Sequence, residues 1–434
     1  NHMKKDDIRY KTYIKILEEE LVPAFGCTEP IALAYAAARA REVLGDVPDR
    51  VVLQVSGSII KNVKSVIVPN TNHLKGIPAA AAAGIIAGDP DKELEVISQV
   101  AEDQVDKIKA FLENAPIEVE LIDYGHIFDI IVTEYKGDSY AKVRIADYHT
   151  NIVLIEKDGN ILLEKELKSE EAGSEEQANR ADRGLLNMED IWDFANTVDT
   201  ADVSKLLDRQ IRYNNAIAEE GLLGDYGANI GSVLLHSYGN DITVRAKAKA
   251  AAGSDARMNG CELPVIINSG SGNQGITCSV PLIEYAKELN SSKEELYRAL
   301  VLSNLVAIHE KTGIGTLSAY CGAVSAGAGA GAGIVYLCGG DYQAAIHTVV
   351  NALAIVSGIV CDGAKASCAA KIAFSVDAGI LGYNMYKNDQ EFKGGDGIVM
   401  KDVESTIRGI GRLGKDGMRE TNEEIIKLMV NEDC

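Results

Sequence analysis

The sequence predicts an α/β N-terminal half, with helices and antiparallel strands, followed by an all-α C-terminal half rich in glycine and alanine. Hydrophobic residues alternate with period two between residues 117 and 163, which is typical of half-buried strands. Helical periodicity dominates after residue 188, and glycine alternates with alanine at 327–333, a pattern that favours close helix packing. Because 434 residues are long for one domain, we expect two domains, at 1–185 and 186–434.

The first 90 residues carry several start and stop signals. Pro23 ends the first periodic stretch, and Thr28 with Pro30 favours the start of a second helix. Cys27 is therefore expected at a helix N-terminus. The expected elements are helices over 8–22, 31–44 and 78–88 and short strands over 51–56 and 64–68.

Between residues 117 and 163, turns near residues 124–125, 136–138 and 158–160 separate the alternating stretches and predict an antiparallel meander. The charged, Glu-rich residues 167–184 are predicted to form an exposed linker. The helices expected after it include 188–198, 202–219, 241–252, 281–289 and 293–309.

Charge and hydropathy restrict the function. The net charge of −21 disfavours nucleic acid and anionic membranes as partners, and a small anionic substrate would need a local pocket of cations or backbone amides. No stretch has the apolar density of a membrane span, since 319–338 is mostly Ala and Gly. Eight cysteines behind an N-terminus without a visible signal peptide indicate the cytoplasm, with free or metal-bound thiols.

Cys321, Cys361 and Cys368 are the most informative residues, because all three lie among glycines and small residues. Three thiolates are one fewer than a fully protein-ligated iron–sulfur cluster requires, so one iron would stay open to substrate as a Lewis acid. The alternative is three small hydrophobic residues in a helical core.

The spacing of Cys361 and Cys368 argues against zinc. Seven residues on an unbroken helix rise by about 10 Å, and the short Cys-x2–4-Cys spacing of zinc sites is absent. Asp362-Gly363 can break the helix and bring the thiolates together. Cys434, the last residue, is either a tail residue or a swinging ligand. Cys261, Cys278 and Cys338 are expected in the core.

The loop after residue 268 is a candidate anion site. Its backbone amides can point at a carboxylate, although no Walker or dinucleotide-binding spacing is present. Asn273 and Gln274 add specific amide groups, whereas the simpler alternative is an ordinary turn. The residues expected to bind substrate are Ser269, Gly270, Ser271, Gly272, Asn273 and Gln274, with Asn72 from another polar loop.

Three residues are candidates for proton transfer. Cys27, at a helix N-terminus, is expected to have a lowered thiol pKa and could be a base, a nucleophile, a fourth metal ligand or only a buried cap. Lys365 and His73 are the other candidates, and His73 could equally be an ordinary loop histidine.

Taken together, these motifs resemble the L-cysteine desulfidases, relatives of the iron–sulfur L-serine dehydratase alpha chain. The resemblance covers nearly the whole chain. It rests on Phe-Gly-Cys-Thr-Glu-Pro (25–30), Val-Pro-Asn-Thr (68–71), Asn-Ser-Gly-Ser-Gly-Asn-Gln-Gly (268–275), Tyr-Cys-Gly-Ala-Val-Ser-Ala-Gly (320–327) and Cys-Asp-Gly-Ala-Lys-Ala-Ser-Cys-Ala-Ala-Lys (361–371).

The resemblance implies a 4Fe–4S enzyme that eliminates sulfide from L-cysteine to give pyruvate and ammonia. It implies Cys321, Cys361 and Cys368 as cluster ligands, with the Cys27 loop opposite them. The serine dehydratases carry Ser-Ser-His-Thr where this chain has Gly-Cys-Thr-Glu, which favours cysteine over serine as substrate. L-Serine dehydration and a non-catalytic cluster-binding sensor remain alternatives, and a homodimer is compatible with the sequence.

Overall fold

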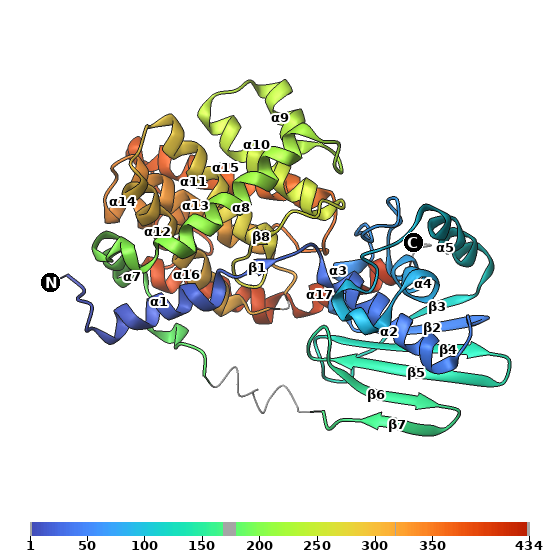
Figure 1. Cartoon of the computed structure of the whole chain (residues 1–434). Coiled ribbons are helices and arrows are strands. Elements are labelled where there is room, and N and C mark those ends of the chain that lie inside the picture. The colour runs from blue at the N-terminus through green and yellow to red at the C-terminus, as the bar shows by residue number, and fades with distance from the viewer. Residues whose placement is uncertain (1, 168–178, 317, 432–434) are drawn as a thin grey trace.

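The computed structural model describes residues 2–167, 179–316 and 318–431 (Figure 1). A sheet-containing N-terminal part lies beside a larger helical part, as predicted. The N-terminal part contains α1 (Ile8–Glu20), β1 (Pro23–Ala24), α2 (Thr28–Leu44), β2 (Arg50–Val55), α3 (Gly57–Val63), α4 (Ile77–Ala87), η1 (Pro90–Glu95), α5 (Glu102–Asn114), β3 (Ile117–Leu121), β4 (Asp129–Lys136), β5 (Ser139–Ala146), β6 (Ile152–Lys157) and β7 (Asn160–Glu164).

The helical part confirms the predicted all-α C-terminal half, apart from one two-residue strand. Its elements are η3 (Arg183–Leu185), α7 (Met188–Thr197), η4 (Thr200–Asp202), α8 (Ser204–Leu223), α9 (Ile230–Tyr238), α10 (Ile242–Met258), β8 (Val265–Ile266), α11 (Gly272–Glu288), α12 (Lys293–Ile314), α13 (Gly322–Leu337), α14 (Tyr342–Val356), α15 (Ser367–Lys387), α16 (Val403–Arg412), the π-helical turn η5 (Leu413–Gly417) and α17 (Arg419–Val430).

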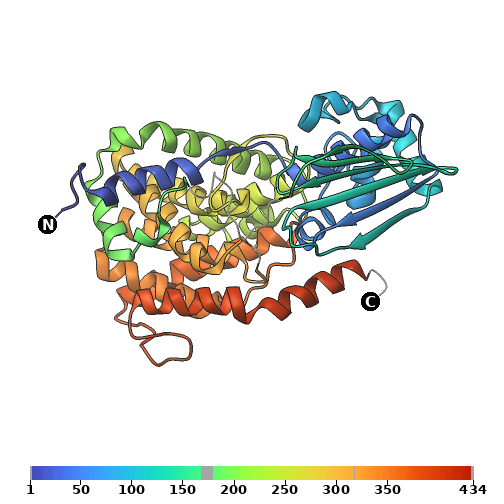
Figure 2. The same ribbon diagram turned by 90° about the horizontal axis from the view of Figure 1, so that it is seen from below.

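The larger sheet has the strand order β3-β2-β4-β5-β6-β7, and helices α2 and α4 cover one face of it (Figures 1 and 2). β2 has a buried, alternating face at Val51, Leu53 and Val55, which packs in one hydrophobic core with the alanines of the two helices. The helices themselves approach closely, because a methyl group on Gly84 of α4 would lie 2.1 Å from the carbonyl oxygen of Ala34 in α2.

The predicted antiparallel meander is confirmed for β4 to β7 and wrong for β3. β3 pairs with β2, in parallel, and β2 separates it from β4. The expected strand over 64–68 is also wrong. Only Ile67 forms an isolated bridge, with Lys75, because the intervening loop turns through Asn70, Asn72 and His73, whose φ angles are 62°, 55° and 72°. Of the predicted linker, residues 168–178 lie outside the described residues.

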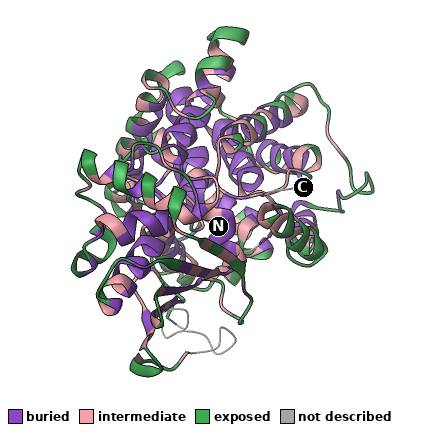
Figure 3. Ribbon diagram, turned by 90° about the vertical axis from the view of Figure 1, so that its right-hand side faces the viewer, coloured by how far each residue is buried: buried purple, intermediate pink, exposed green. Residues whose placement is uncertain are grey.

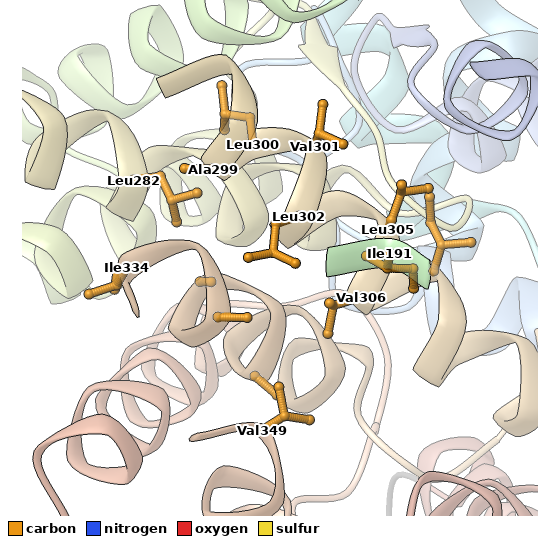
Figure 4. Packing of buried hydrophobic residues seen from close by; sticks show 14 of the residues in the cluster. Ile191, Leu282, Ala299, Leu300, Val301, Leu302, Leu305, Val306, Ile334 and Val349 are labelled. Atoms are coloured by element: carbon orange, nitrogen blue, oxygen red, sulfur yellow. The ribbon is translucent and has the colours of Figure 1, made fainter. Parts of the chain in front are cut away.

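The helical part is built around α12 and α13, and most of its buried hydrophobic residues form one large cluster (Figures 3 and 4). The alternating glycines of α13 allow close helix packing, as expected. A methyl group on Gly327 would lie 2.4 Å from the carbonyl oxygen of Ser375, and one on Gly329 would lie 2.6 Å from that of Ser303. These contacts draw α15 and α12 against α13.

The two terminal helices each pack against the other half of the chain. Tyr13 and Leu17 of α1 belong to the core of the helical part, whereas Met429 of α17 packs against the core of the sheet part. Figure 2 shows α17 extending from the helical part to the sheet part. We propose that the domain boundary lies between residues 185 and 186. Each terminal helix then packs against the domain to which it does not belong in sequence.

Among the described residues, no helix is long and apolar enough to cross a membrane.

Candidate functional site

A short antiparallel bridge places Cys321 beside Cys361. Tyr320 pairs with Val360, and the N–H groups of the two cysteines donate across the bridge over 3.1 and 2.6 Å. Because side chains alternate along extended segments, both thiols lie on the face opposite Tyr320. Tyr320 is buried and shares a 2.9 Å hydrogen bond with the Ser357 hydroxyl, which anchors the far side of the bridge.

Cys368 joins these two cysteines because the chain is not helical between Cys361 and α15. Gly363 has a φ of 93°, and the Cys368 thiol donates to its carbonyl oxygen at 3.2 Å. Burial, and then the charge of Cys361, raises the pKa of Cys321 to about 11, and Cys368 adds to this effect. The three predicted thiols therefore lie within electrostatic range of one another. Among the described residues, no group of three or more His, Cys, Asp or Glu side chains is arranged to hold a metal ion.

Four lysines surround the three thiols. Lys365 and Lys371 both form ion pairs with Asp362, which lies next to Cys361. Lys61 and Lys311 have no carboxylate partner in the described parts of the chain. Burial lowers the pKa of each, and the charge of Cys361 opposes that shift. The cations thus outnumber the carboxylates around the cysteines.

The predicted anion loop is a tight turn followed by a helix N-terminus. Ser269 and Gly270 both have positive φ, 51° and 76°, and Asn268 and Ser271 exchange two backbone hydrogen bonds around them. This is the geometry of a type I′ turn. The Ser271 hydroxyl then caps α11 by accepting from the N–H of Gln274 at 3.2 Å. Buried amide groups hold the turn from behind, since Asn268 donates to the side chain of Asn304 at 3.0 Å.

Three polar side chains at this loop have buried atoms without a partner among the described residues: Oδ1 of Asn273, Oε1 of Gln274 and Nε of Arg257. Arg257 lies against Gly272, where a methyl group would come within 2.1 Å of the guanidinium. Gln274 lies against Gly322, next to Cys321, where the corresponding distance is also 2.1 Å. Since buried polar groups are normally paired, these atoms are free to bond to a ligand.

Cys27 is the N-cap of α2, one residue before the expected Thr28, and its side chain is only 8% exposed. It packs with Val66, Met258 and Ala364. The expectation of a lowered pKa is wrong. Burial raises the pKa of the Cys27 thiol, although the Arg257 guanidinium lowers it.

Cys27 and Cys368 lie close enough for their charges to interact. The predicted cysteines and the anion loop are therefore linked to one another by contacts and by charge. We refer to this group as the candidate site. Its members are Cys27, Arg257, Asn273, Gln274, Cys321, Cys361 and Cys368.

The remaining predicted residues have different surroundings. Asn72 and His73 are exposed in the loop before α4, and no hydrogen bond or ion pair links either side chain to the candidate site. Cys261 and Cys278 are buried as expected, whereas Cys338 is exposed at the end of α13, which corrects its assignment to the core. Cys434 lies outside the described residues.

Sequence reasoning missed Arg257, Lys61 and Lys311. Arg257 could have been noticed, because it is a charged residue between small ones near the end of a helix, in Gly-Ser-Asp-Ala-Arg-Met. Lys61 lies some 300 positions before Cys361, so only the folded chain brings the two residues together.

The candidate site thus combines three thiols, the lysines around them and unpartnered polar side chains from several helices. Residues 91–427 match the family model described as serine dehydratase alpha chain. The chain belongs to that family.

Similar proteins extend over its full length. A UPF0597 protein of Desulfitobacterium hafniense is 62% identical over 430 residues, covering 99% of both chains. One from Lachnoclostridium phytofermentans is 52% identical, covering 97% of this chain and 100% of its own, and one from Treponema denticola is 46% identical, covering 99% and 100%.

Proposed function

We propose that this chain is an iron–sulfur lyase that eliminates hydrogen sulfide from L-cysteine. The observation that carries the proposal is the candidate site itself, in which three thiols lie near an unpartnered guanidinium donor and two unpartnered amide oxygens. The alternatives are an L-serine dehydratase of the same family and a non-catalytic cluster-binding sensor. Free thiols at all seven described cysteines suit a reducing compartment, and we propose the cytoplasm.

The chemistry of the three thiols suits a 4Fe–4S cluster, because such a cluster is bound by thiolates on separate irons and does not need three side chains gathered around one ion. Cys321, Cys361 and Cys368 would be its three ligands, and the lysines around them suit a centre that carries thiolate charge. A cluster bound by three cysteines leaves one iron free, which would serve as a Lewis acid toward the leaving sulfur.

The anion loop would hold the substrate carboxylate. The Arg257 guanidinium has an unpartnered Nε–H to donate, and the backbone amides at the start of α11 favour an anion. The amide oxygens of Asn273 and Gln274 are unpartnered acceptors that suit the substrate ammonium group. Substrate bound in this way would have its side chain directed toward the cysteines beside Gly322.

Cys27 is the residue we assign to removal of the α-proton. Burial raises the pKa of its thiol, and the charge of the Arg257 guanidinium, which favours the thiolate, opposes that rise. Lys365 is a weaker candidate because Asp362 and the Gly363 carbonyl hold its ammonium group, and His73 is exposed on a separate loop.

The overall reaction balances with one water. Loss of the α-proton and of the β-sulfur gives 2-aminoacrylate and hydrogen sulfide. The enamine then tautomerises to an imine, and water hydrolyses the imine to pyruvate and ammonia. No oxidant or reductant is required.

Replacing Arg257 by methionine removes the proposed carboxylate contact. We expect KM for the amino acid to rise roughly tenfold or more, because a hydrogen bond to a charged group contributes about 1.5–3 kcal/mol. Iron content should be unchanged. The exposed Arg408→Met provides the control. An unchanged KM in Arg257→Met would remove Arg257 from substrate binding.

Steady-state rates with L-cysteine and L-serine test the reaction. We expect kcat/KM for L-cysteine to exceed that for L-serine by roughly ten- to a hundredfold, since the two substrates differ only in the leaving group. Sulfide and ammonia should form in equal amounts. A clear preference for serine would assign the protein to the dehydratase alternative, and no turnover of either amino acid by iron-loaded protein would favour a sensor.

A further inference from the structure

Lys61 of α3 contacts the Cys361 loop through both its main chain and its side chain. Its carbonyl oxygen accepts the N–H of Ala364 at 3.0 Å, while its Nζ donates to the carbonyl oxygen of Cys361 at 2.9 Å. The contact with the loop is tight, because a methyl group on Gly363 would lie 2.0 Å from the Lys61 carbonyl oxygen. One residue of the sheet domain thus holds the segment between Cys361 and Cys368.

The same ammonium group also reaches the segment that precedes Cys321. Its Nζ lies 3.5 Å from the carbonyl oxygen of Ser318. Lys61 therefore lies between the two segments that carry Cys321 and Cys361, and it comes from a part of the chain that contributes no proposed ligand. Figure 1 shows α3 at the junction of the two domains.

In the described parts of the chain no carboxylate forms an ion pair with Lys61, although Asp362 lies within electrostatic range. The residue is only 5% exposed, and both its side-chain hydrogen bonds go to neutral carbonyl groups. Lys311 of α12 lies close enough for the two ammonium charges to repel each other. A buried cation such as Lys61, with a second cation in range, is unfavourable unless an anion offsets the charge. Cys321 and Cys361, which become thiolates when they bind a metal, both lie within electrostatic range of the two lysines, and Asp362 also attracts Lys61.

We propose that Lys61 is a positioning residue for the iron–sulfur centre: it fixes the Cys321 and Cys361 segments from the sheet domain and, with Lys311, offsets the negative charge of the ligated centre. This inference rests on the proposed function, because it requires that a cluster binds. It predicts that cluster retention depends on the sheet domain.

The test compares Lys61→Met, Lys61→Arg and Lys311→Met with wild type and with Lys107→Met, an exposed lysine on α5. Each protein is reconstituted anaerobically with iron and sulfide. The readouts are iron per chain, the rate at which a chelator bleaches the visible absorption, and the reduction potential of the cluster. Circular dichroism of each apoprotein checks the fold.

We expect Lys61→Met to lose iron to the chelator roughly tenfold faster or more, as is typical when a residue supporting a metal ligand is removed. Its reduction potential should become more negative, because a nearby positive charge favours the reduced cluster. Lys311→Met should shift the reduction potential in the same direction. Its effect on iron retention should be smaller, because no described hydrogen bond joins the Lys311 side chain to the segments that carry Cys321 and Cys361. Lys61→Arg should restore most of the retention.

If Lys61→Met matches wild type in both retention and potential, the inference is overturned and the proposed function stands. If wild type itself binds no iron, the proposed function fails first. Should Lys61→Met not fold, Lys311→Met tests the charge assignment. An unchanged reduction potential in Lys311→Met overturns it, whereas a negative shift supports it.

Discussion

Replacing Cys321, Cys361 or Cys368 by alanine is expected to abolish cluster retention in each case. Iron per chain should fall from about four to near zero, because two cysteines cannot hold such a cluster firmly. The Tyr320–Val360 bridge and the turn at Gly363 bring these three thiols together, and no other described cysteine shares that environment. The measurement is iron and acid-labile sulfide analysis with the visible spectrum, on protein purified without oxygen.

Cys278→Ala and Cys338→Ala are the controls for these variants. Cys278 is fully buried in the helical core and Cys338 is exposed at the end of α13, so both test cysteine loss away from the site. Both should keep the visible absorption. If a control bleached the protein while Cys361→Ala did not, the ligand assignment would be wrong.

Cys27→Ser is expected to keep its iron and its visible spectrum while turnover falls roughly 10²- to 10⁴-fold, the usual contribution of general acid–base catalysis. Serine keeps the size of the side chain and the helix cap but is a far weaker base at neutral pH. Iron content and kcat measured on the same preparation separate the two effects.

The other outcomes for Cys27→Ser are equally informative. Loss of iron would make Cys27 a fourth ligand rather than a base. Unchanged turnover would reduce it to the N-cap of α2, and Lys365 would become the next residue to replace. Lys365→Met should then be compared with Lys371→Met, because Asp362 binds both lysines.

Local patterns in the sequence predict most elements of the fold. Period-two alternation predicts β4 to β7, and the glycines of α13 predict close helix packing, because both patterns depend on near neighbours along the chain. The position of β3 could not be predicted in this way. β2 inserts between β3 and β4 from more than 60 residues away, and no local signal encodes that pairing.

The candidate site shows the same limit. Cysteines among glycines and a Ser-Gly-Ser-Gly turn stand out in the sequence, so the structure could be expected to gather them. Arg257 and Lys61 do not stand out, since their importance arises from what lies opposite them in the fold. The pKa of Cys27 was mispredicted because a helix N-terminus is visible in a sequence, whereas full burial of the thiol is not.

The central claim is that the three cysteines hold an iron–sulfur cluster, and metal analysis of the wild-type protein tests it most directly. Protein purified and reconstituted without oxygen should contain about four iron and four acid-labile sulfide per chain and absorb visible light. Colourless protein without iron after reconstitution would contradict the claim, and the three cysteines would then be small side chains at a domain junction.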